Sequence, residues 1–365
     1  MTEKEIGISS TIIAWYQIHK RDLPWRETSD PYLIWISEII LQQTRVAQGL
    51  EYYKHFISRF PDIMTLASAT EDEVLKYWQG LGYYSRARNL RTAAISIANR
   101  FGGEFPKDYK AILSLKGIGE YTASAIVSFA WDMPYPVLDG NVYRVLSRLY
   151  AIDLPIGTTE SKKVFTELAT CLMDKQRAGL YNQAIMEFGA LQCIPHNPDC
   201  QTCPLSEKCE AYVSGQTNKF PAKKHSSKQH VRFFNYIHII YKETTYLLRR
   251  ENNDIWKGLY EFPLIETENA VNFHQLEELE SFNKMFQGTK LLDIKPQLEN
   301  LKHQLSHQTI YASFYKIHIA TPLQGNGKYQ PVNSADLELF PVSKLTDIYK
   351  VKLPKECILL EMSVY

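Results

Sequence analysis

The stretch LKGIGEYTASAIVSFAWDMPYPVLDGNVYR, residues 115–144, decides the fold of the N-terminal part of the chain. A Gly-x-Gly turn from Gly117 to Gly119 joins two segments with helical patterning. The two glycines allow a tight turn and leave backbone N–H groups exposed at a helix N-terminus, which suits a phosphate. An ordinary helix–helix turn is the alternative, because a lone Gly-x-Gly motif has little specificity.

Two prolines, Pro134 and Pro136, end the helix that follows this turn, because proline cannot donate a helical hydrogen bond. The chain then brings Asp139-Gly140-Asn141 to the start of the next helix. Aspartate is a frequent helix N-cap, and the helix dipole favours its ionised form there. Asp139 is therefore predicted to be a cap, a functional carboxylate, or both.

Length and composition indicate an ordinary globular protein with more than one domain. The chain has 365 residues, of which 45% are hydrophobic and 22% charged. No run approaches the ~20 apolar residues of a membrane helix, and the N-terminus lacks a secretory signal, so we expect a cytoplasmic protein, nucleoid-associated if bacterial. Its net charge is only +1, so any nucleic-acid contact must use local basic surface, backbone amides and stacking.

Helical patterning dominates the first 220 residues, and we predict no strand among them. A short amphipathic helix is expected around residues 12–16, and Asp30-Pro31 starts a helix, YLIWISEIILQQTR, that is apolar on most sides and should be buried. Further helices are predicted at 46–60, 71–79, 86–101, 108–114, 120–130, 140–150, 160–174 and 178–190.

The pattern changes after the polar, basic stretch SGQTNKFPAKKHSSKQH, residues 214–230, which predicts a linker. Its lysines could contact phosphates, although a solvated linker is the simpler interpretation. Strands are predicted at RFFNYIHIIY, TTYLLRR and ASFYKIHIA, and short helices at SKLTDIY and ECILLEM. The last third is therefore expected to be a smaller α+β domain.

Four cysteines form a C-x6-C-x2-C-x5-C pattern, namely Cys193, Cys200, Cys203 and Cys209. An intracellular chain rarely uses such cysteines for disulfides, so they indicate zinc or an iron–sulfur cluster. Spacing alone favours zinc, because structural zinc sites are commoner, although zinc ribbons usually have two close pairs. The isolated Cys171 and Cys357 are predicted to be buried thiols.

Glu38 lies within the apolar helix, between isoleucines. A carboxyl group in an apolar setting keeps its proton near neutral pH, because desolvation disfavours the charged form. Such a group can protonate a leaving group. The alternative is a buried structural glutamate paired with an arginine such as Arg45 or Arg88.

Taken together, these motifs resemble the helix–hairpin–helix DNA glycosylases, and within them the MutY family of adenine DNA glycosylases. The resemblance covers nearly the whole chain. It is carried by LPWR at 23–26, SEIILQQTRV at 37–46, GLGYYSRARNL at 80–90, LKGIGEYTASAI at 115–126, VLDGNVYRVLSRL at 137–149 and the cysteine loop.

The resemblance implies a multidomain α and α+β protein. An all-α glycosylase domain, 1–213, would have one lobe of about 31–130 and a second of about 1–30 plus 131–213, with a DNA cleft between them. The linker 214–230 would lead to a Nudix-like lesion-recognition domain, 231–365, which lacks a Nudix box and so agrees with a non-hydrolytic role. The resemblance also implies a [4Fe–4S] cluster on the four cysteines, in place of the zinc that spacing alone favours.

The resemblance further implies the chemistry. Glu38 would be the general acid and Asp139 would stabilise the sugar cation, electrostatically or by transient covalent capture, with Asn141 beside it. Tyr121 stands where endonuclease III-type relatives have a lysine. Because tyrosine cannot form a Schiff base, a monofunctional enzyme is expected, with water completing hydrolysis.

Several loops resemble the DNA-contacting segments of the family, although composition alone indicates only helix ends and surface loops. The implied contacts are Trp25, Arg26, Gln43, Thr44, Leu81, Gly82, Tyr83, Gly117, Gly119, Ser306 and His307. Leu81 is expected to act as a wedge and Tyr83 as a stacking face. Leu305 replaces the usual Phe of the lesion-sensing loop, and Lys116 replaces a Pro.

The expected function is base excision repair: hydrolysis of the N-glycosidic bond of adenine opposite 8-oxoguanine or guanine in duplex DNA. We expect a monomer, with repair and replication proteins as further candidate partners and no membrane contact. Two alternatives remain. One is a thymine-mismatch glycosylase, which the added C-terminal domain disfavours. The other is a catalytically inert iron–sulfur DNA-binding protein, which the two carboxylates disfavour.

Overall fold

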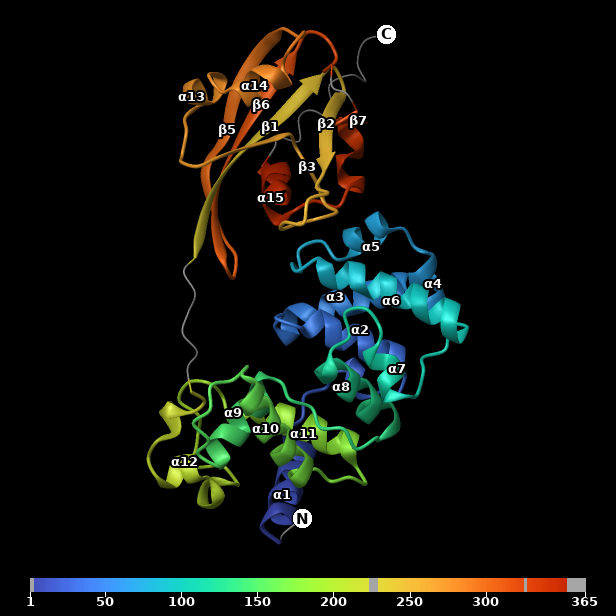
Figure 1. Cartoon of the computed structure of the whole chain (residues 1–365), viewed down its shortest axis with the longest axis vertical. Helices are drawn as coiled ribbons and strands as arrows, with labels where there is room; N and C mark the ends of the chain where they lie inside the picture. Colours follow the sequence, from blue (N-terminus) through green and yellow to red (C-terminus); the bar gives the residue numbers. More distant parts are fainter. Residues whose placement is uncertain (1–2, 223–228, 325–326, 353–365) are drawn as a thin grey trace. The chain divides into compact units, whose positions relative to one another are not determined.

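A computed structural model describes residues 3–222, 229–324 and 327–352 of the chain (Figure 1). Its contacts divide the chain into two compact units. The helical unit comprises Met1–Ser68 and Asn89–His225, and the C-terminal unit comprises Ala69–Arg88 and Ser226–Tyr365. This division differs from the predicted domain boundaries at residues 69–88, which group with the C-terminal residues.

The described residues up to 222 form helices and loops, as predicted. The helices of the helical unit are α1 Glu3–His19, η1 Pro24–Arg26, α2 Pro31–Leu41, α3 Val46–Arg59, α4 Ile63–Ser68, α6 Ser85–Phe101 (whose first turn belongs to the other unit), α7 Tyr109–Leu113, α8 Glu120–Trp131, α9 Gly140–Leu149, α10 Thr159–Leu172, α11 Ala178–Leu191, η2 Ser206–Lys208, α12 Glu210–Val213 and η3 Thr217–Lys219.

Helix α1 is longer than the short helix predicted, because its apolar stripe starts earlier. Ile8, Ile12, Trp15 and Tyr16 are all buried in the same core. Helix α2 is buried along most of its length, as its composition predicts. The side chain of Asp30 caps it by accepting a hydrogen bond from the backbone N–H of Tyr32 at 2.8 Å.

Helix α8 packs between α2 and α11, which brings the motif-bearing helices together. Its small residues 122–125 are all buried, so neighbouring helices can approach closely. The same close packing occurs between α11 and α9. A Cβ atom on Gly189 of α11 would lie 2.7 Å from Cβ of Asn141 on α9, so only glycine fits there.

The Gly-x-Gly turn depends on its first glycine. Gly117 has φ +80°, a left-handed conformation that favours glycine, and an added Cβ would lie 2.6 Å from Cβ of Asn89 on α6. Gly119 is the N-cap of α8, and the space beside it is open. The turn is therefore a tight, exposed helix junction.

The C-terminal unit contains a mixed sheet with the strand order β3-β2-β1-β6-β5; β4 also pairs with β1 and β7 with β2. Strands β1 and β6 are parallel and the other pairs are antiparallel. The strands are β1 His230–Tyr241, β2 Thr244–Arg249, β3 Tyr260–Glu261, β4 Leu264–Thr267, β5 Leu291–Gln304, β6 Gln308–Ile319 and β7 Gln330–Asn333. The helices are α5 Glu71–Tyr77, α13 Phe273–Glu277, α14 Glu280–Met285, η4 Ser334–Leu339 and α15 Lys344–Lys352.

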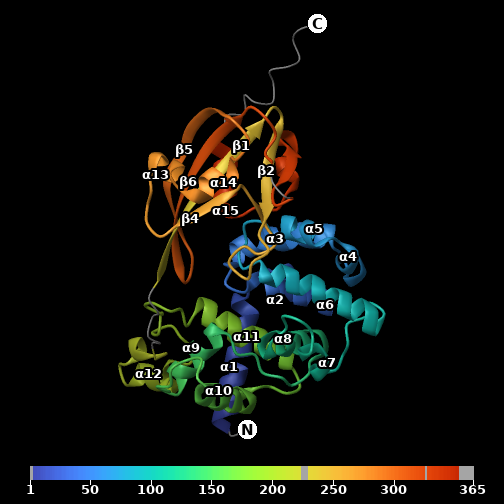
Figure 2. The same ribbon diagram turned by 45° about the horizontal axis from the view of Figure 1, so that its top comes forward.

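Helices cover both faces of this sheet (Figure 2). Side chains alternate along β1: Phe234 and Tyr236 join the core that includes α15, whereas Ile237 and Ile239 join the core that includes α13 and α14. A strand covered on both faces reads as a nearly continuous apolar run, which is why β1 is prominent in the sequence.

The predicted strands correspond to β1, β2 and β6, and the helix predicted at 343–349 corresponds to α15. The helix predicted at 356–362 lies outside the described residues, as does Cys357. Strand β5 was not predicted, because it carries Pro296 and shifts register against β6, so its alternation is broken. Cys171 is exposed, which corrects the prediction of a buried thiol.

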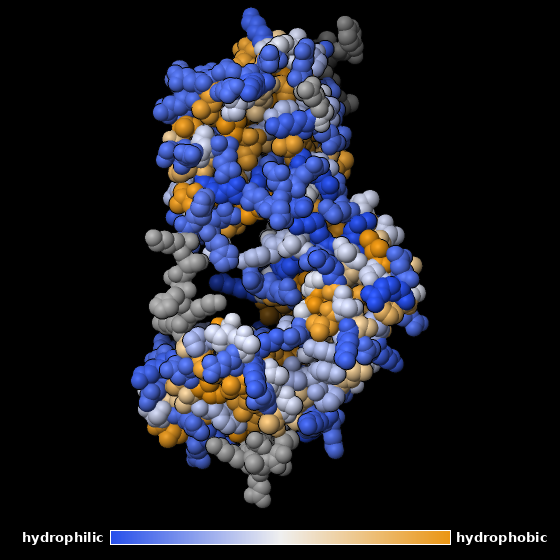
Figure 3. All heavy atoms as spheres, in the orientation of Figure 1, coloured by the Kyte–Doolittle hydropathy of each residue, from blue (hydrophilic) through white to orange (hydrophobic). Residues whose placement is uncertain are grey.

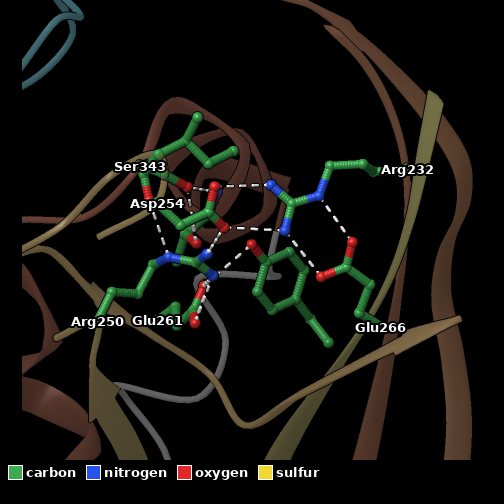
Figure 4. A network of polar contacts seen from close by, with 9 residues as sticks. Arg232, Arg250, Asp254, Glu261, Glu266 and Ser343 are labelled. Atoms are coloured by element: carbon green, nitrogen blue, oxygen red, sulfur yellow. Dashed lines mark hydrogen bonds and ion pairs between the residues drawn. The ribbon is translucent and has the colours of Figure 1, made fainter. Parts of the chain in front are cut away.

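A network of charged side chains ties the loop after β2 to the sheet (Figure 4). Arg232 of β1 pairs with Glu266 of β4 at 2.7 Å and with Asp254 at 2.9 Å. Arg250 pairs with Asp254 at 2.7 Å and with Glu261 of β3 at 2.8 Å. Glu261 is only 3% exposed, so this pair is buried.

Residues 69–88 belong to the C-terminal unit through polar contacts of α5 and of the start of α6. Arg249 Nη2 lies 2.9 Å from Glu71 Oε1 and 3.0 Å from Asp72 Oδ1. Tyr260 Oη donates a hydrogen bond to Asp72 at 2.9 Å, and Arg88 donates to the carbonyl of Lys257. These contacts could not be read from the sequence, because they join segments about 170 to 190 residues apart.

The predicted linker begins as a packed segment. Phe220 is buried, and its carbonyl accepts a hydrogen bond from Arg148 Nε at 3.2 Å, so the segment up to Phe220 packs on the helical unit. Residues 223–228 of the predicted linker lie outside the described residues.

Hydrophilic side chains predominate on the face drawn in Figure 3, and hydrophobic residues form smaller patches among them. Within the described ranges, no helix is long and apolar enough to cross a membrane.

Candidate active site

Glu38 lies on the buried side of α2 and is 5% exposed. Its partner is Tyr121 of α8, whose hydroxyl donates a hydrogen bond to Glu38 Oε2 at 2.6 Å, rather than the alternative partners Arg45 or Arg88. Burial raises the pKa of Glu38 to about 7, against the opposing effects of the Tyr121 hydrogen bond and the charge of Arg26. Glu38 therefore keeps its proton at a higher pH than an exposed glutamate does.

Asp139 is the N-cap of α9, which is one of the two roles predicted for it from the sequence. Its Oδ1 accepts from the backbone N–H of Val142 and its Oδ2 from Nδ2 of Asn141, both at 2.8 Å. Burial raises the pKa of Asp139, whereas these hydrogen bonds oppose the shift. Because both oxygens accept N–H donors, the setting suits a carboxylate.

Asn141 is itself fixed from behind by Arg144. The Nη2 of Arg144 donates to Asn141 Oδ1 and to the carbonyl of Gly189, and its Nε donates to the carbonyl of Cys193, each at 2.7 Å. The side chain beside Asp139 is therefore held in a single orientation.

A cavity of about 530 Å³ brings these residues together. This size lies within the range of about 300–1,000 Å³ typical of small-molecule sites. The predicted site residues that line it are Glu38, Tyr121, Asp139, Asn141, Trp25, Arg26, Gln43 and Thr44. They come from α2 and the loop after it, from η1, from α8, and from the start of α9.

Sequence reasoning missed two charged residues of the same cavity, Glu187 and Arg21. Glu187 lies on α11 and accepts hydrogen bonds from Nε and Nη2 of Arg21, both at 2.7 Å, and from Nη2 of Arg26 at 3.2 Å. Burial alone would raise the pKa of Glu187, but the two guanidinium groups outweigh it and lower the pKa. The available signal was a carboxylate inside an apolar helix, the same signal that marks Glu38.

The predicted DNA-contacting residues of the helical unit differ in exposure. Gln43 is exposed and has φ +57°, so the loop after α2 turns sharply there. Trp25 is buried and packs edge-on against Tyr53, with the two ring centroids 5.2 Å apart. Gly117 and Gly119 lie on the exposed helix junction.

The remaining predicted contacts lie in the C-terminal unit. Tyr83 is 45% exposed, follows the left-handed Gly82, and shares a short hydrogen bond with the hydroxyl of Ser306. Ser306 and His307 are exposed at the turn between β5 and β6. Leu81 is buried, so the structure does not place the predicted wedge at the surface.

Leu305, which replaces the expected Phe, packs at the edge of the sheet core. Its backbone N–H donates to the carbonyl of Gln308 at 2.8 Å and closes the turn. This residue therefore anchors the turn that presents Ser306.

All four cysteines of the motif line one cavity of the helical unit. Arg148 Nη1 lies 3.4 Å from Cys193 Sγ and also donates to the carbonyl of Ile194. Burial and the neighbouring thiols raise the pKa of Cys203 to about 11. A bound cationic group would favour the thiolates instead.

Across the described part of the chain, no three His, Cys, Asp or Glu side chains form a group that could hold a single metal ion. The four cysteines nevertheless line one cavity, so the donor set that an iron–sulfur cluster takes, cysteine thiolates, is gathered in one place.

Comparisons with known proteins agree with this geometry. The family model of the HhH-GPD superfamily base excision DNA repair protein matches residues 36–170, and that of the NUDIX domain matches residues 235–349. The adenine DNA glycosylase of Buchnera aphidicola subsp. Baizongia pistaciae is 36% identical over 305 residues, which cover 82% of this chain and 83% of the relative. The chain belongs to the adenine DNA glycosylase family.

A second member of the adenine DNA glycosylase family, from Buchnera aphidicola subsp. Schizaphis graminum, is 35% identical and covers 94% of this chain and 98% of its own length. Among solved structures, a thermostable thymine-DNA glycosylase is 30% identical with a TM-score of 0.53, and covers 58% of this chain and 98% of its own. The family expected from the motifs and the fold class, a helix–hairpin–helix domain followed by a Nudix-like domain, are thereby confirmed.

Proposed function

We propose that this chain is a monofunctional DNA glycosylase that hydrolyses the N-glycosidic bond of adenine opposite 8-oxoguanine or guanine in duplex DNA. One observation carries the proposal. A buried Glu38, hydrogen-bonded to Tyr121 at 2.6 Å, lines the same cavity as the capped carboxylate Asp139. Two carboxylates in different environments are what acid-assisted cleavage of a glycosidic bond requires.

Glu38 supplies the proton in this mechanism. Adenine is a poor leaving group as an anion, and protonation at N7 lets it leave as a neutral base. With a pKa of about 7, Glu38 holds its proton in a useful fraction of molecules and releases it readily. Tyr121 orients the carboxyl group through its hydrogen bond.

Asp139 acts on the sugar. As the base departs, positive charge develops on the deoxyribose ring, and a fixed carboxylate nearby stabilises it. The N–H donors of Val142 and Asn141 keep Asp139 in position without a positive charge in direct contact with it. Water then completes the hydrolysis, because Tyr121 offers no amine for a covalent imine.

The substrate base must leave the helical stack to reach the cavity. We propose that Gln43 and the exposed Tyr83 contact the opened duplex, and that the Gly117–Gly119 turn binds a phosphate. The exposed Ser306 and its hydrogen bond to Tyr83 support a role for the β5–β6 turn in recognising the base opposite adenine.

Both proposed lobes contribute residues to the cavity. Glu38, Gln43 and Tyr121 come from the proposed lobe 31–130, whereas Arg26 and Asp139 come from the proposed lobe of 1–30 plus 131–213. We infer that the cavity lies between these lobes and that one copy of the chain suffices for the reaction.

We further infer that a [4Fe–4S] cluster is held by Cys193, Cys200, Cys203 and Cys209. When bound, it would link the ends of the 193–209 loop and hold this loop beside α9. No step of base excision requires it.

The deciding experiment compares duplexes carrying A opposite 8-oxoguanine, A opposite G, and T opposite G under single-turnover conditions, followed by alkali. We expect adenine release, fastest opposite 8-oxoguanine, with strand breaks only after alkali. Preferential release of thymine would instead favour the activity of the thymine-DNA glycosylase to which the helical part is similar. No release from any duplex would indicate an inert DNA-binding protein.

A further inference from the structure

A buried amide joins α8, α11 and the connection from α8 to α9. The amide belongs to Asn182 of α11, which is 1% exposed. Its Nδ2 donates to the hydroxyl of Ser128 on α8 at 2.9 Å and to the carbonyl of Tyr135 at 2.8 Å. Its Oδ1 accepts from the backbone N–H of Val137 at 3.3 Å. Both hydrogens and the oxygen of this amide are therefore used.

The connection from α8 to α9, residues 132–139, has no regular structure of its own. Pro134 and Pro136 have no N–H to donate, and Pro134 and Tyr135 are exposed. An irregular, partly exposed segment moves more than the helices it joins unless other groups fix it. This segment ends at Asp139, so its position decides where that carboxylate lies.

The hydrogen bonds of Asp139 fix its side chain to α9. It accepts from the backbone N–H of Val142 and from Nδ2 of Asn141, both in the first turn of that helix. Glu38 lies on α2 and Tyr121 on α8. The distance from Asp139 to these two residues therefore depends on how α9 is joined to α8.

Helix α11 approaches α8 closely beside this amide. A Cβ atom on Gly179 would lie 2.5 Å from the carbonyl oxygen of Ser128, the residue that Asn182 also contacts. The backbone N–H of Gly179 donates to Oδ1 of Asp132, the C-cap of α8, at 2.9 Å. Helix α11 thus holds the connection at its start as well as at the points that Asn182 contacts.

We propose that Asn182 is a positioning residue for base excision: it ties α8 to the connection that ends at Asp139, and so sets the distance between this carboxylate and the Glu38–Tyr121 pair. The inference rests on the proposed role of Asp139 in stabilising the sugar cation. Asn182 is not among the residues that line the cavity, so it acts through Asp139 rather than by touching the substrate.

The first measurement is the single-turnover rate of adenine release from the A opposite 8-oxoguanine duplex by Asn182→Ala. A fixed charge stabilises the transition state only from the correct place, and misplacement by about 1 Å can slow a reaction about 10²-fold. Without the amide the connection can shift, so we expect release to slow by about 10–10²-fold. Binding to the same duplex should stay close to wild type, because Asn182 does not line the cavity.

Leu172→Ala is the matched control. Leu172 lies on α10 in the same buried core as Val137 and is not among the residues that line the cavity. This variant should lower the thermal unfolding midpoint. Its rate of adenine release should stay close to wild type at a temperature at which both variants are folded.

A double-mutant cycle with Asp139→Asn separates positioning from a general loss of structure. In Asp139→Asn the charge whose position Asn182 sets is absent. Adding Asn182→Ala should then slow release by less than about threefold further. A purely structural role would slow release by the same factor in both backgrounds.

A wild-type rate in Asn182→Ala, or an equal loss in both backgrounds, would overturn the proposal. If Asn182→Ala does not fold, Ser128→Ala decides, because it removes the contact of Asn182 with α8. It should slow release when Asp139 is present and not in Asp139→Asn, and an unchanged rate overturns the proposal. Failure of the proposed function looks different: wild-type protein would release no adenine, or a folded Asp139→Asn would keep the wild-type rate, and the inference would fall with it.

Discussion

At the residue scale, two carboxylates in similar sequence surroundings have opposite protonation behaviour. Glu38 and Glu187 are both buried in apolar helices, yet the pKa of Glu38 is raised and that of Glu187 is lowered. The difference is the partner, a neutral phenol for Glu38 and two guanidinium groups for Glu187. Burial of a glutamate could be predicted from the flanking residues. Its partner could not, because that depends on which distant helix packs beside it.

Asp139 has two roles that one substitution can separate. Asparagine also caps helices, so Asp139→Asn should leave the thermal unfolding midpoint within a few degrees of wild type. Because the charge that stabilises the sugar cation is lost, single-turnover excision should slow by about 10²–10³-fold. A wild-type rate in a folded Asp139→Asn protein would show that this residue is only a cap.

At the element scale, the 193–209 loop has little regular structure of its own and depends on what its cysteines bind. Its regular part is η2, and the remainder is irregular loop and turns. The cysteine pattern predicted a metal site, but spacing alone pointed to zinc. The resemblance of the whole set of motifs to the adenine DNA glycosylases was needed to replace zinc by a [4Fe–4S] cluster, and the structure adds only that the four thiols line one cavity.

Cys200→Ser should therefore lower both iron content and stability. We expect anaerobically purified wild-type protein to contain about four iron atoms per chain and to absorb broadly in the visible range. The variant should lose most of that iron and unfold at a lower temperature, because a coordinated loop contributes folding energy. The exposed Cys171 offers a matched control, and Cys171→Ser should keep the iron. Stoichiometric zinc in place of iron would contradict the cluster assignment.

The charge network of the C-terminal unit gives a second prediction about an element. Arg250→Met leaves the buried Glu261 without its arginine partner, which should cost about 3–5 kcal/mol of stability. The exposed pair of Lys284 and Glu280 is the control, since Lys284→Met should cost at most about 1 kcal/mol. Hydrogen exchange of β1 and β2 amides measures both. Equal protection in the two variants would mean that the network does not hold the loop after β2.

At the scale of the whole molecule, the all-α part and the change to α+β structure could be predicted because helix and strand periods differ. The helices of the first 220 residues and strands β1, β2 and β6 carry strong patterns. Strands such as β5 could not be predicted, since Pro296 and register shifts interrupt the alternation. The grouping of residues 69–88 with the C-terminal unit also could not, because it depends on contacts such as that of Arg249 with Glu71.

The central claim is that Glu38 supplies the proton that lets adenine leave. Glu38→Gln keeps the size of the side chain and a hydrogen-bonding group for Tyr121 but cannot supply that proton. Single-turnover excision of A opposite 8-oxoguanine should fall by at least about 10²-fold, while binding to the same duplex survives. If Glu38→Gln released adenine at the wild-type rate, Glu38 would be a buried structural residue and the mechanism would be wrong.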